Sequence, residues 1–205
     1  MKILVLFKTH LDIGFTDFSS EVVRKYNERY IPQAIDVAEE IARSERPEGF
    51  VWTTGSWLPY QYLRTVSDGA RDRMVYAIRN HWFSWHGLPC TLHSEYADGA
   101  LFDYGLSISR KLDATFGRHT IGAKYTDVPG HTAAIVPRLA RAGIQFLHIG
   151  VNPASTPVDV PLFFRWRFGG ETIQVMYNGG NYGEFAKIPG TDTAIYFAHT
   201  GDNLG

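Results

Sequence analysis

The 205-residue sequence has a single cysteine and no long apolar run. Cys90 has no second cysteine to pair with, which is typical of proteins in a reducing compartment, so we expect a cytoplasmic location. No apolar run approaches the roughly 18 residues of a membrane span. The apolar start Met1–Phe7 is followed at once by Lys8, His10 and Asp12, so we expect neither a signal peptide nor a membrane partner.

An excess of charge of one sign is also missing. The 20 Lys and Arg residues nearly balance the 21 Asp and Glu residues, the formal net charge is −1, and no basic run is present. Binding to nucleic acid or to an anionic membrane surface would favour a basic protein, so neither is a predicted partner. No repeat or low-complexity linker divides the sequence. We therefore expect one domain over residues 1–205.

Strand-like and helix-like patterns alternate through most of the chain. The segments typical of strands are 2–7, 50–55, 82–87, 120–127, 144–150, 163–178 as a hairpin, and 194–203; those typical of helices are 19–44 with a break at Pro32, 56–80, 100–117 and 131–143. This alternation is typical of βαβ units, so the sequence predicts an α/β fold with a mostly parallel sheet. The continuous apolar run KILVLF (2–7) predicts a strand buried on both faces.

Polar residues follow three of the predicted strands, in LFKTHLD, GAKYTD and YFAHTGD. The carboxyl ends of parallel strands form the edge at which active sites of α/β proteins lie. We therefore expect five residues distant in sequence to meet at one edge: His10, Asp12, Asp127, His199 and Asp202.

His10 and Asp12 allow two interpretations. Residues i and i+2 of a strand point to the same side, and an imidazole nitrogen and a carboxylate oxygen are both Zn²⁺ ligands. Such a triplet is, however, more often a packed histidine beside a capping aspartate. Asp127 likewise precedes the turn at Pro129–Gly130 and could simply accept backbone N–H bonds there, or it could be a third ligand or a nucleophile.

Two segments resemble motifs of a known family. HLDIGF (10–15) is similar to the His-x-Asp-x-Gly-Trp motif that opens the catalytic domain of glycoside hydrolase family 38, the α-mannosidases. TDVPGHT (126–132) is similar to the Asp-x-Phe-Gly-His-Ser segment of that family, in the same order and at a similar separation. Softer similarities follow in LARAGIQFLHIG, FFRWRFGGETIQVM and HTGDNLG. Phe15 stands where the family usually has Trp, and Pro129 where it has Phe.

The resemblance implies a partial (β/α)7-type barrel that binds one Zn²⁺ or a similar divalent ion. His10 and Asp12 would be metal ligands, and Asp127 would be both a ligand and the nucleophile of a retaining glycoside hydrolase acting on α-mannoside-like or related glycans. The family's catalytic unit is longer and supplies a fourth ligand, a histidine, from a later region. The resemblance therefore implies a fragment truncated at its C-terminus, in which His199 is a substitute candidate.

Other assignments stay open at the level of the sequence. The candidates for the general acid are Glu95, Asp98, Asp103 and Asp202. The candidates for an aromatic surface that stacks on a sugar are Trp52, Trp57, Trp85, Trp166 and Tyr182, although each is more often a core residue. The alternative functions are a metal-dependent carbohydrate deacetylase and a non-catalytic carbohydrate-binding fragment. A deacetylase commonly shows an early Asp-Asp pair and a His-x-x-x-His helix, and neither is present.

Overall fold

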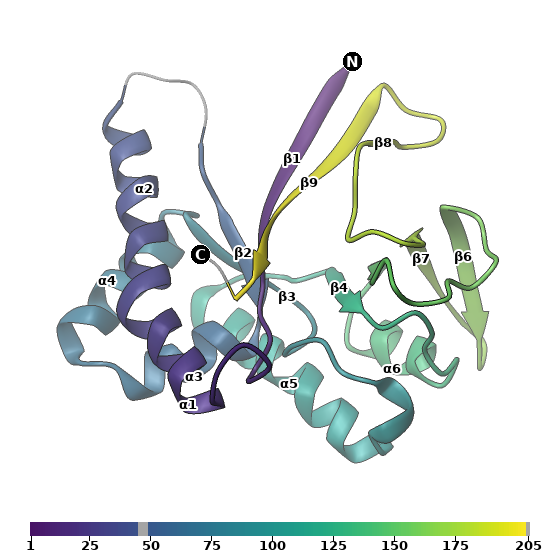
Figure 1. Ribbon diagram of the computed structural model, residues 1–205, viewed down its shortest axis with the longest axis horizontal. Coiled ribbons are helices and arrows are strands. Elements are labelled where there is room, and N and C mark those ends of the chain that lie inside the picture. Colours follow the sequence, from purple (N-terminus) through teal and green to yellow (C-terminus); the bar gives the residue numbers. More distant parts are fainter. Residues whose placement is uncertain (45–48, 204–205) are drawn as a thin grey trace.

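The protein is described by a computed structural model over residues 1–44 and 49–203, without the side chains of Lys8, His199, Thr200 and Asp202. The strands of the described residues, most of them labelled in Figure 1, are β1 (Lys2–His10), β2 (Trp52–Gly55), β3 (Phe83–His86), β4 (Gly122–Asp127), β5 (Phe146–Val151), β6 (Phe163–Phe168), β7 (Glu171–Asn178), β8 (Ala186–Lys187) and β9 (Thr193–Asp202). The helices are α1 (Ser19–Lys25), α2 (Ile31–Arg43), α3 (Trp57–Thr65), α4 (Asp68–Arg79), α5 (Gly99–Phe116) and α6 (Ile135–Arg141).

The strands form two sheets that are mostly parallel. The first has the order β3-β2-β1-β9-β8, in which only β8 is antiparallel to its neighbour, and the second has the order β4-β5-β7-β6, in which β6 is antiparallel to β7. The predicted α/β fold is therefore confirmed. Within the described residues no strand ladder joins the two sheets, although Gly87 N–H donates to the carbonyl of Gly122 at 2.8 Å. A closed or partial barrel stays a prediction.

Each sheet has its own apolar core. Helices α1 to α4 gather on one side of β1, β2 and β3, whereas α5 and α6 lie below the other sheet in the view of Figure 1. The first core includes Tyr26, Ile35, Trp52, Leu58, Met74, Ile78 and Phe83. The second includes Leu106, Tyr125, Leu139, Leu147, Ile149 and Val175. None of the helices in the described ranges is long and apolar enough to cross a membrane.

The helical segment 19–44 contains a π-helical turn instead of a break. The turn η1 (Tyr26–Tyr30) connects α1 directly to α2, and Pro32 lies in the first turn of α2. A proline inside a helix has no N–H and its ring collides with the carbonyl four residues earlier. Widening the helix by one residue per turn before Pro32 removes this collision and lets the helix continue.

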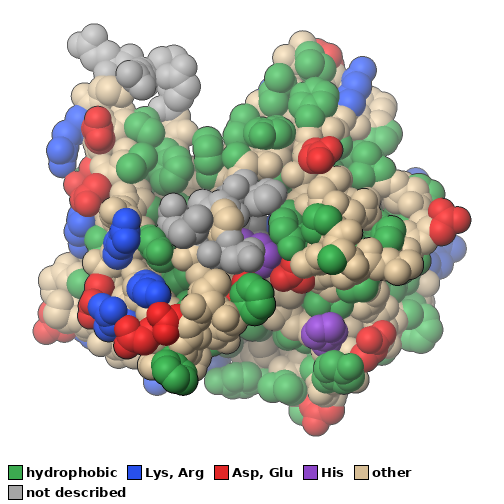
Figure 2. Space-filling view, in the orientation of Figure 1, with side chains coloured by type: hydrophobic (Ala, Val, Ile, Leu, Met, Phe, Trp, Pro, Cys, Tyr) green, Lys and Arg blue, Asp and Glu red, His purple; other side chains and the backbone are tan. Residues whose placement is uncertain are grey.

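The N-terminal half of β1 is exposed, so the prediction that segment 2–7 is buried on both faces is wrong. Ile3, Val5 and Phe7 are 49%, 48% and 42% exposed. The reason is that β2 pairs with β1 only at Phe7 and Lys8, whereas the preceding residues pair with β9 alone. The first residues of β1 thus form a two-stranded ribbon with β9, and hydrophobic side chains lie on its visible surface (Figure 2).

Candidate active site

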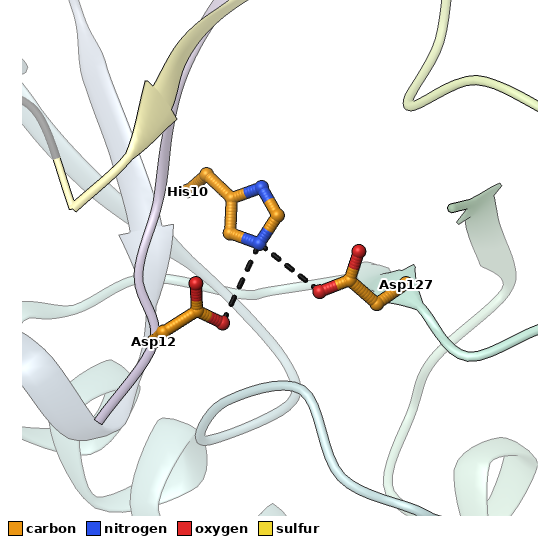
Figure 3. A group of neighbouring side chains, drawn as sticks. All are labelled: His10, Asp12 and Asp127. Atoms are coloured by element: carbon orange, nitrogen blue, oxygen red, sulfur yellow. Dashed lines mark hydrogen bonds and ion pairs between the residues drawn. The ribbon is translucent and has the colours of Figure 1, made fainter. Parts of the chain in front are cut away.

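His10, Asp12 and Asp127 converge at the carboxyl ends of β1 and β4 (Figure 3). His10 Nε2 lies 3.1 Å from Asp127 Oδ2 and 3.5 Å from Asp12 Oδ1. The His10 side chain is 5% exposed, and the two carboxylates are 25% and 34% exposed. The imidazole thus forms the inner wall of the site, and the carboxylates reach towards solvent.

The separations between these atoms fit a divalent metal ion. One ligand atom from each residue lies within 4.8 Å of the other two. Ligand atoms bound tetrahedrally to zinc at about 2.0–2.2 Å lie roughly 3.3–3.6 Å apart. The 3.5 Å contact of His10 Nε2 with Asp12 falls in this range, and the 3.1 Å contact with Asp127 is slightly shorter. That nitrogen carries at most one hydrogen and can donate it to only one carboxylate. A cation between the three groups would contact all of them.

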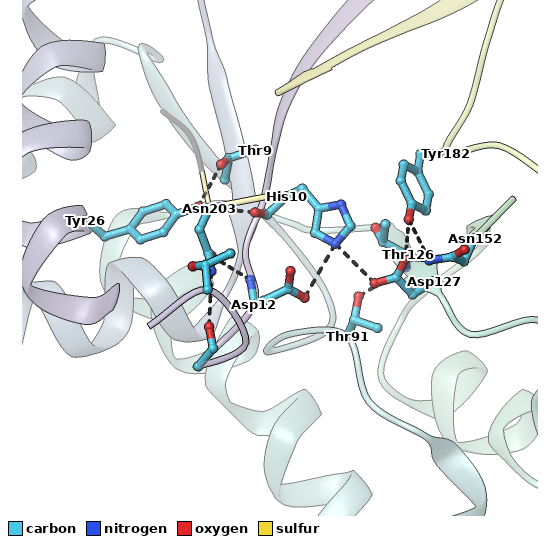
Figure 4. Close-up of polar contacts among 12 residues, drawn as sticks. Thr9, His10, Asp12, Tyr26, Thr91, Thr126, Asp127, Asn152, Tyr182 and Asn203 are labelled. Atoms are coloured by element: carbon cyan, nitrogen blue, oxygen red, sulfur yellow. Dashed lines mark hydrogen bonds and ion pairs between the residues drawn. The ribbon is translucent and has the colours of Figure 1, made fainter. Parts of the chain in front are cut away.

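The loop after β1 is fixed by a residue near the other end of the chain. Between Lys8 and His10 the ladder with β9 shifts, because β9 contains one residue more than β1, and such bulges redirect side chains at sheet edges. Beyond the bulge, Asn203 donates its backbone N–H to the His10 carbonyl at 2.9 Å. Its side-chain oxygen accepts from the backbone N–H of Asp12 at 2.8 Å (Figure 4). Asn203 therefore positions the Asp12 backbone.

Thr9 connects the same strand end to the helices. The Thr9 hydroxyl and the Tyr26 hydroxyl are 2.9 Å apart, and Tyr26 also donates to the His10 carbonyl at 3.4 Å (Figure 4). Burial raises the pKa of the Tyr26 phenol to about 12, against a smaller opposing effect of the bond to Thr9. Tyr26 thus stays neutral and anchors the end of β1.

Asp127 has an unusual backbone conformation and specific side-chain partners. Its φ is 75°, in the left-handed region that costs most residues roughly 1–2 kcal/mol and that aspartate tolerates better. Its Oδ1 accepts hydrogen bonds from the Tyr182 hydroxyl at 2.5 Å and from Asn152 Nδ2 at 3.3 Å. Oδ2 faces His10. The two carboxylate oxygens therefore have different surroundings, with two hydrogen-bond donors at Oδ1 and the His10 imidazole beside Oδ2.

A pocket of about 370 Å³ opens above these groups. The described residues that line it are His10, Asp12, Phe15, His93, Asp127, Val128, Pro129, Asn152, Ser155 and Tyr182. Phe15, which stands at the Trp position of the family motif, is 85% exposed at its rim. The pocket thus presents two carboxylates, imidazoles and aromatic rings to a ligand, a combination suited to a polyhydroxylated molecule.

Three of the candidate general acids do not line this pocket. Asp98 accepts from the backbone N–H of Leu101 at the start of α5, and Asp103 forms an ion pair with Arg138. Glu95 is exposed in a short 3₁₀ turn, Ser94–Tyr96. The side chains of the fourth candidate, Asp202, and of the candidate ligand His199 lie outside the described residues.

The candidate sugar-stacking residues divide in a similar way. Trp52 and Trp85 are each 4% exposed and belong to the first core, and Trp166 packs against the second. Of the five candidates, Tyr182 is the one that lines the pocket. Its ring meets the His10 ring edge-on at 5.0 Å, and its hydroxyl contacts Asp127 and Asn152, so two of its contacts are with predicted metal ligands.

His131 of the TDVPGHT segment contacts Tyr125 and Ser94. Its ring stacks on Tyr125 at 3.9 Å, and its Nδ1 lies 3.1 Å from the Ser94 hydroxyl. Burial, with a further effect from His93, lowers the pKa of the His131 imidazole to about 4. His131 is therefore a neutral packing residue, and helix α6 begins four residues later than the sequence predicts.

Asn152 and Asn203 were not among the residues predicted from the sequence, and Tyr182 was predicted only as a sugar-stacking residue. Asn152 directly follows β5, so it shares the feature that drew attention to Asp127, a polar residue just after a predicted strand. Asn203 ends the segment YFAHTGDN in the same way. Both could have been found by that rule. Tyr182 lies in a glycine-containing loop after β7 and carries no comparable signal.

A second, larger cavity lies away from these residues. Its volume is about 590 Å³, and its lining includes residues from the amino-terminal parts of β3, β4 and β5, such as Ser84, Lys124 and Phe146. The described lining residues include no carboxylate. His10, Asp12 and Asp127 therefore line the smaller pocket, at the edge where α/β proteins hold their active sites.

Sequence comparison and structure comparison give different results. No family model and no curated protein matches the sequence. Solved structures do match, and the likeness is one of fold alone, to a class of structures that includes an α-mannosidase, a glycosyl hydrolase family 38 protein and a 4-α-glucanotransferase. An α-mannosidase from Enterococcus faecalis V583 has a TM-score of 0.75 at 13% identity, over 97% of this chain and 24% of that one.

Two further structures belong to the same class. A protein in glycosyl hydrolase family 38 from Enterococcus faecalis has a TM-score of 0.62 at 12% identity, over 97% of this chain and 23% of that one. The 4-α-glucanotransferase from Thermococcus litoralis has a TM-score of 0.57 at 13% identity, over 86% and 28%. This chain therefore spans about a quarter of each of these proteins. The fold agrees with the family that the two motifs resemble.

Proposed function

We propose that the protein is a metal-dependent retaining glycoside hydrolase that acts on α-mannosides or related glycans. The observation that carries the proposal is the convergence of His10, Asp12 and Asp127 within 4.8 Å, at the strand edge of a fold shared with an α-mannosidase. Neither the cluster of side chains nor the shared fold would be sufficient alone, because acidic clusters occur without bound metal ions and one fold can host many functions. Their combination with the two sequence motifs favours a glycosidase.

The side chains have complementary roles in this proposal. His10, Asp12 and Asp127 hold the ion, which as a Lewis acid would polarise sugar hydroxyls. Asp127 bonds to the anomeric carbon as the glycosidic C–O bond breaks and the aglycone leaves with the bonding electrons, and water then hydrolyses the glycosyl ester and restores the carboxylate. Tyr182 and Asn152 donate to Oδ1 and so fix the plane of the carboxylate. Phe15 offers an apolar ring at the rim for the face of a sugar.

Hydrolysis of 4-nitrophenyl α-mannoside in the presence of zinc tests the proposal. We expect turnover by the wild type and a loss of at least about a thousandfold in kcat/KM for Asp127→Asn, because the amide is not a nucleophile. Asp72→Asn is the matched control, since Asp72 is exposed on α4. Equal turnover by wild type and Asp127→Asn would contradict the role of Asp127. Release of acetate from an N-acetylated chito-oligosaccharide, without release of nitrophenol, would instead indicate a deacetylase.

A further inference from the structure

A buried polar network lies between the strands beneath Tyr182. Lys124 of β4, His148 of β5 and Asn178 of β7 are 6%, 1% and 8% exposed. Lys124 Nζ lies 2.6 Å from His148 Nδ1, and His148 Nε2 lies 2.8 Å from Asn178 Oδ1. An amide oxygen only accepts, so Nε2 carries the imidazole hydrogen and Nδ1 accepts from Lys124. The direction of each bond is therefore defined.

One residue, Tyr182, connects this network to Asp127, the proposed nucleophile. Lys124 Nζ also donates to the backbone carbonyl of Tyr182 at 3.0 Å. The hydroxyl of the same tyrosine donates to Asp127 Oδ1 at 2.5 Å. Lys124 thus holds the main chain of the residue whose side chain holds Asp127, and the connection runs from the sheet interior to the pocket.

The loop that carries Tyr182 has little room to move. A Cβ atom on Gly150 would lie 2.6 Å from the Tyr182 Cα, so the loop can approach β5 only because this residue is glycine. Gly183 has a φ of 117°, and a Cβ there would lie 2.7 Å from the Phe197 ring and 2.9 Å from His148. Phe197 in turn stacks on His148 at 4.0 Å. The backbone on both sides of Tyr182 therefore packs closely against β5 and against the rings of His148 and Phe197.

We propose that Lys124 is a positioning residue that acts through Tyr182. It fixes the loop 179–183 from inside, so that the Tyr182 hydroxyl orients the Asp127 carboxylate for the ion and the substrate. The inference rests on the proposed function of Asp127. A purely structural role, in which the Tyr182 carbonyl only satisfies one of the three N–H donors of the buried Lys124, predicts no effect on the loop or on zinc binding beyond a loss of overall stability.

Hydrogen–deuterium exchange of the loop tests the first step without metal or substrate. Lys124→Met keeps the length and the apolar stem of the side chain and removes the donor to Tyr182. We expect faster exchange of the amides in 179–183, by about tenfold or more, while exchange in α5 stays unchanged. Lys111→Met, on the exposed face of α5, is the control and should leave the loop unchanged. Unchanged loop exchange in a folded Lys124→Met would overturn the proposal.

Zinc affinity, measured by calorimetry, tests the second step. Removing partners that orient metal ligands typically weakens metal binding by 10–100-fold, and we expect about this effect for Tyr182→Phe and a similar one for Lys124→Met. Because Lys124 acts through Tyr182, the double variant should bind zinc no more weakly than Tyr182→Phe alone. The coupling between Lys124 and Tyr182 would be refuted if the fold losses in zinc affinity of the two single variants multiplied in the double variant. It would also be refuted if Lys124→Met bound zinc as tightly as the wild type.

A third variant covers the case in which Lys124→Met does not fold. Gly150→Ala displaces the Tyr182 backbone and leaves the residues Lys124, Tyr182 and Asp127 themselves unchanged. It should reproduce both the faster loop exchange and the weaker zinc binding, and wild-type behaviour in both would refute the proposal. Absence of zinc binding by the wild type would defeat the proposed function, whereas the exchange measurement would still decide whether Lys124 holds the loop.

Discussion

Replacement of Asn203 by glycine tests how the site is assembled from the two ends of the chain. The Asn203 side chain accepts from Asp12 N–H at 2.8 Å and donates to Thr16 Oγ1 at 2.8 Å and to the Gly14 carbonyl at 3.3 Å. The residue is 7% exposed and has a φ of 51°. Glycine accepts this backbone conformation without strain, so Asn203→Gly removes the three bonds and little else from the folded state.

The size of the effect follows from these bonds. Each contributes a net 0.5–1.5 kcal/mol or so, and glycine adds about 0.5–1 kcal/mol through the entropy of the unfolded chain. We therefore expect Asn203→Gly to lower the free energy of unfolding by about 2–5 kcal/mol. Asn203→Asp keeps an oxygen that accepts from Asp12 N–H and loses the two donors, so it should cost about half as much.

Urea denaturation followed by tryptophan fluorescence measures both variants, in the absence of metal so that binding does not contribute. The order Asn203→Gly, Asn203→Asp, wild type, from least to most stable, is the expected result. A loss below about 0.5 kcal/mol for Asn203→Gly would refute the conclusion that Asn203 holds the loop after β1. It would then leave the position of Asp12 to be explained by other contacts.

Three further predictions concern stability. Because burial lowers the pKa of His131 to about 4, its contribution is present above the unfolded value near 6.5 and is lost as the pH falls through 4. Between pH 7 and 4.5 the wild type should therefore lose about 2 kcal/mol more than His131→Phe in urea titrations, and equal losses would contradict the assignment. Asp113 accepts hydrogen bonds from Trp85 Nε1, Thr120 N–H and Thr120 Oγ1, all at 2.8–2.9 Å. Asp113→Ala should therefore lower the free energy of unfolding by about 2–4 kcal/mol, whereas the control Asp72→Ala, at an exposed residue, should lower it by less than about 0.5 kcal/mol. Val5→Thr on the exposed part of β1 should cost less than about 1 kcal/mol, whereas Leu147→Ala in the core should cost about 2–5 kcal/mol in thermal or chemical unfolding. If Val5→Thr lowered the free energy of unfolding by more than about 1 kcal/mol, the N-terminal part of β1 would have to be buried in solution.

Local features of the sequence were sufficient to predict most of the elements. The helix that ends at Gly117 and the hairpin that turns at Gly169–Gly170 are present because periodicity and glycine conformations act over a few residues. The convergence of His10 and Asp127 followed from a rule of topology, that parallel strands bring their carboxyl ends to one edge. Such rules hold without knowledge of individual contacts.

The features that were missed depend on longer-range packing. An apolar run is equally compatible with a buried strand and with the exposed ribbon that β1 forms, because exposure depends on where β2 begins to pair. The bond between Tyr182 and Asp127 joins residues 55 apart through a loop without periodicity. His131 belongs to the motif segment, yet its ring orientation is set by contacts with Tyr125 and Ser94, which the local sequence does not specify.

The most direct test of the central claim is a crystal structure of the protein grown with zinc, with anomalous data collected at the zinc absorption edge. The account predicts one anomalous peak about 2.0–2.2 Å from His10 Nε2, Asp12 Oδ1 and Asp127 Oδ2, and its loss in Asp12→Ala. A peak elsewhere, no peak, or an equal peak in Asp12→Ala would contradict the claim that these three side chains form a metal site.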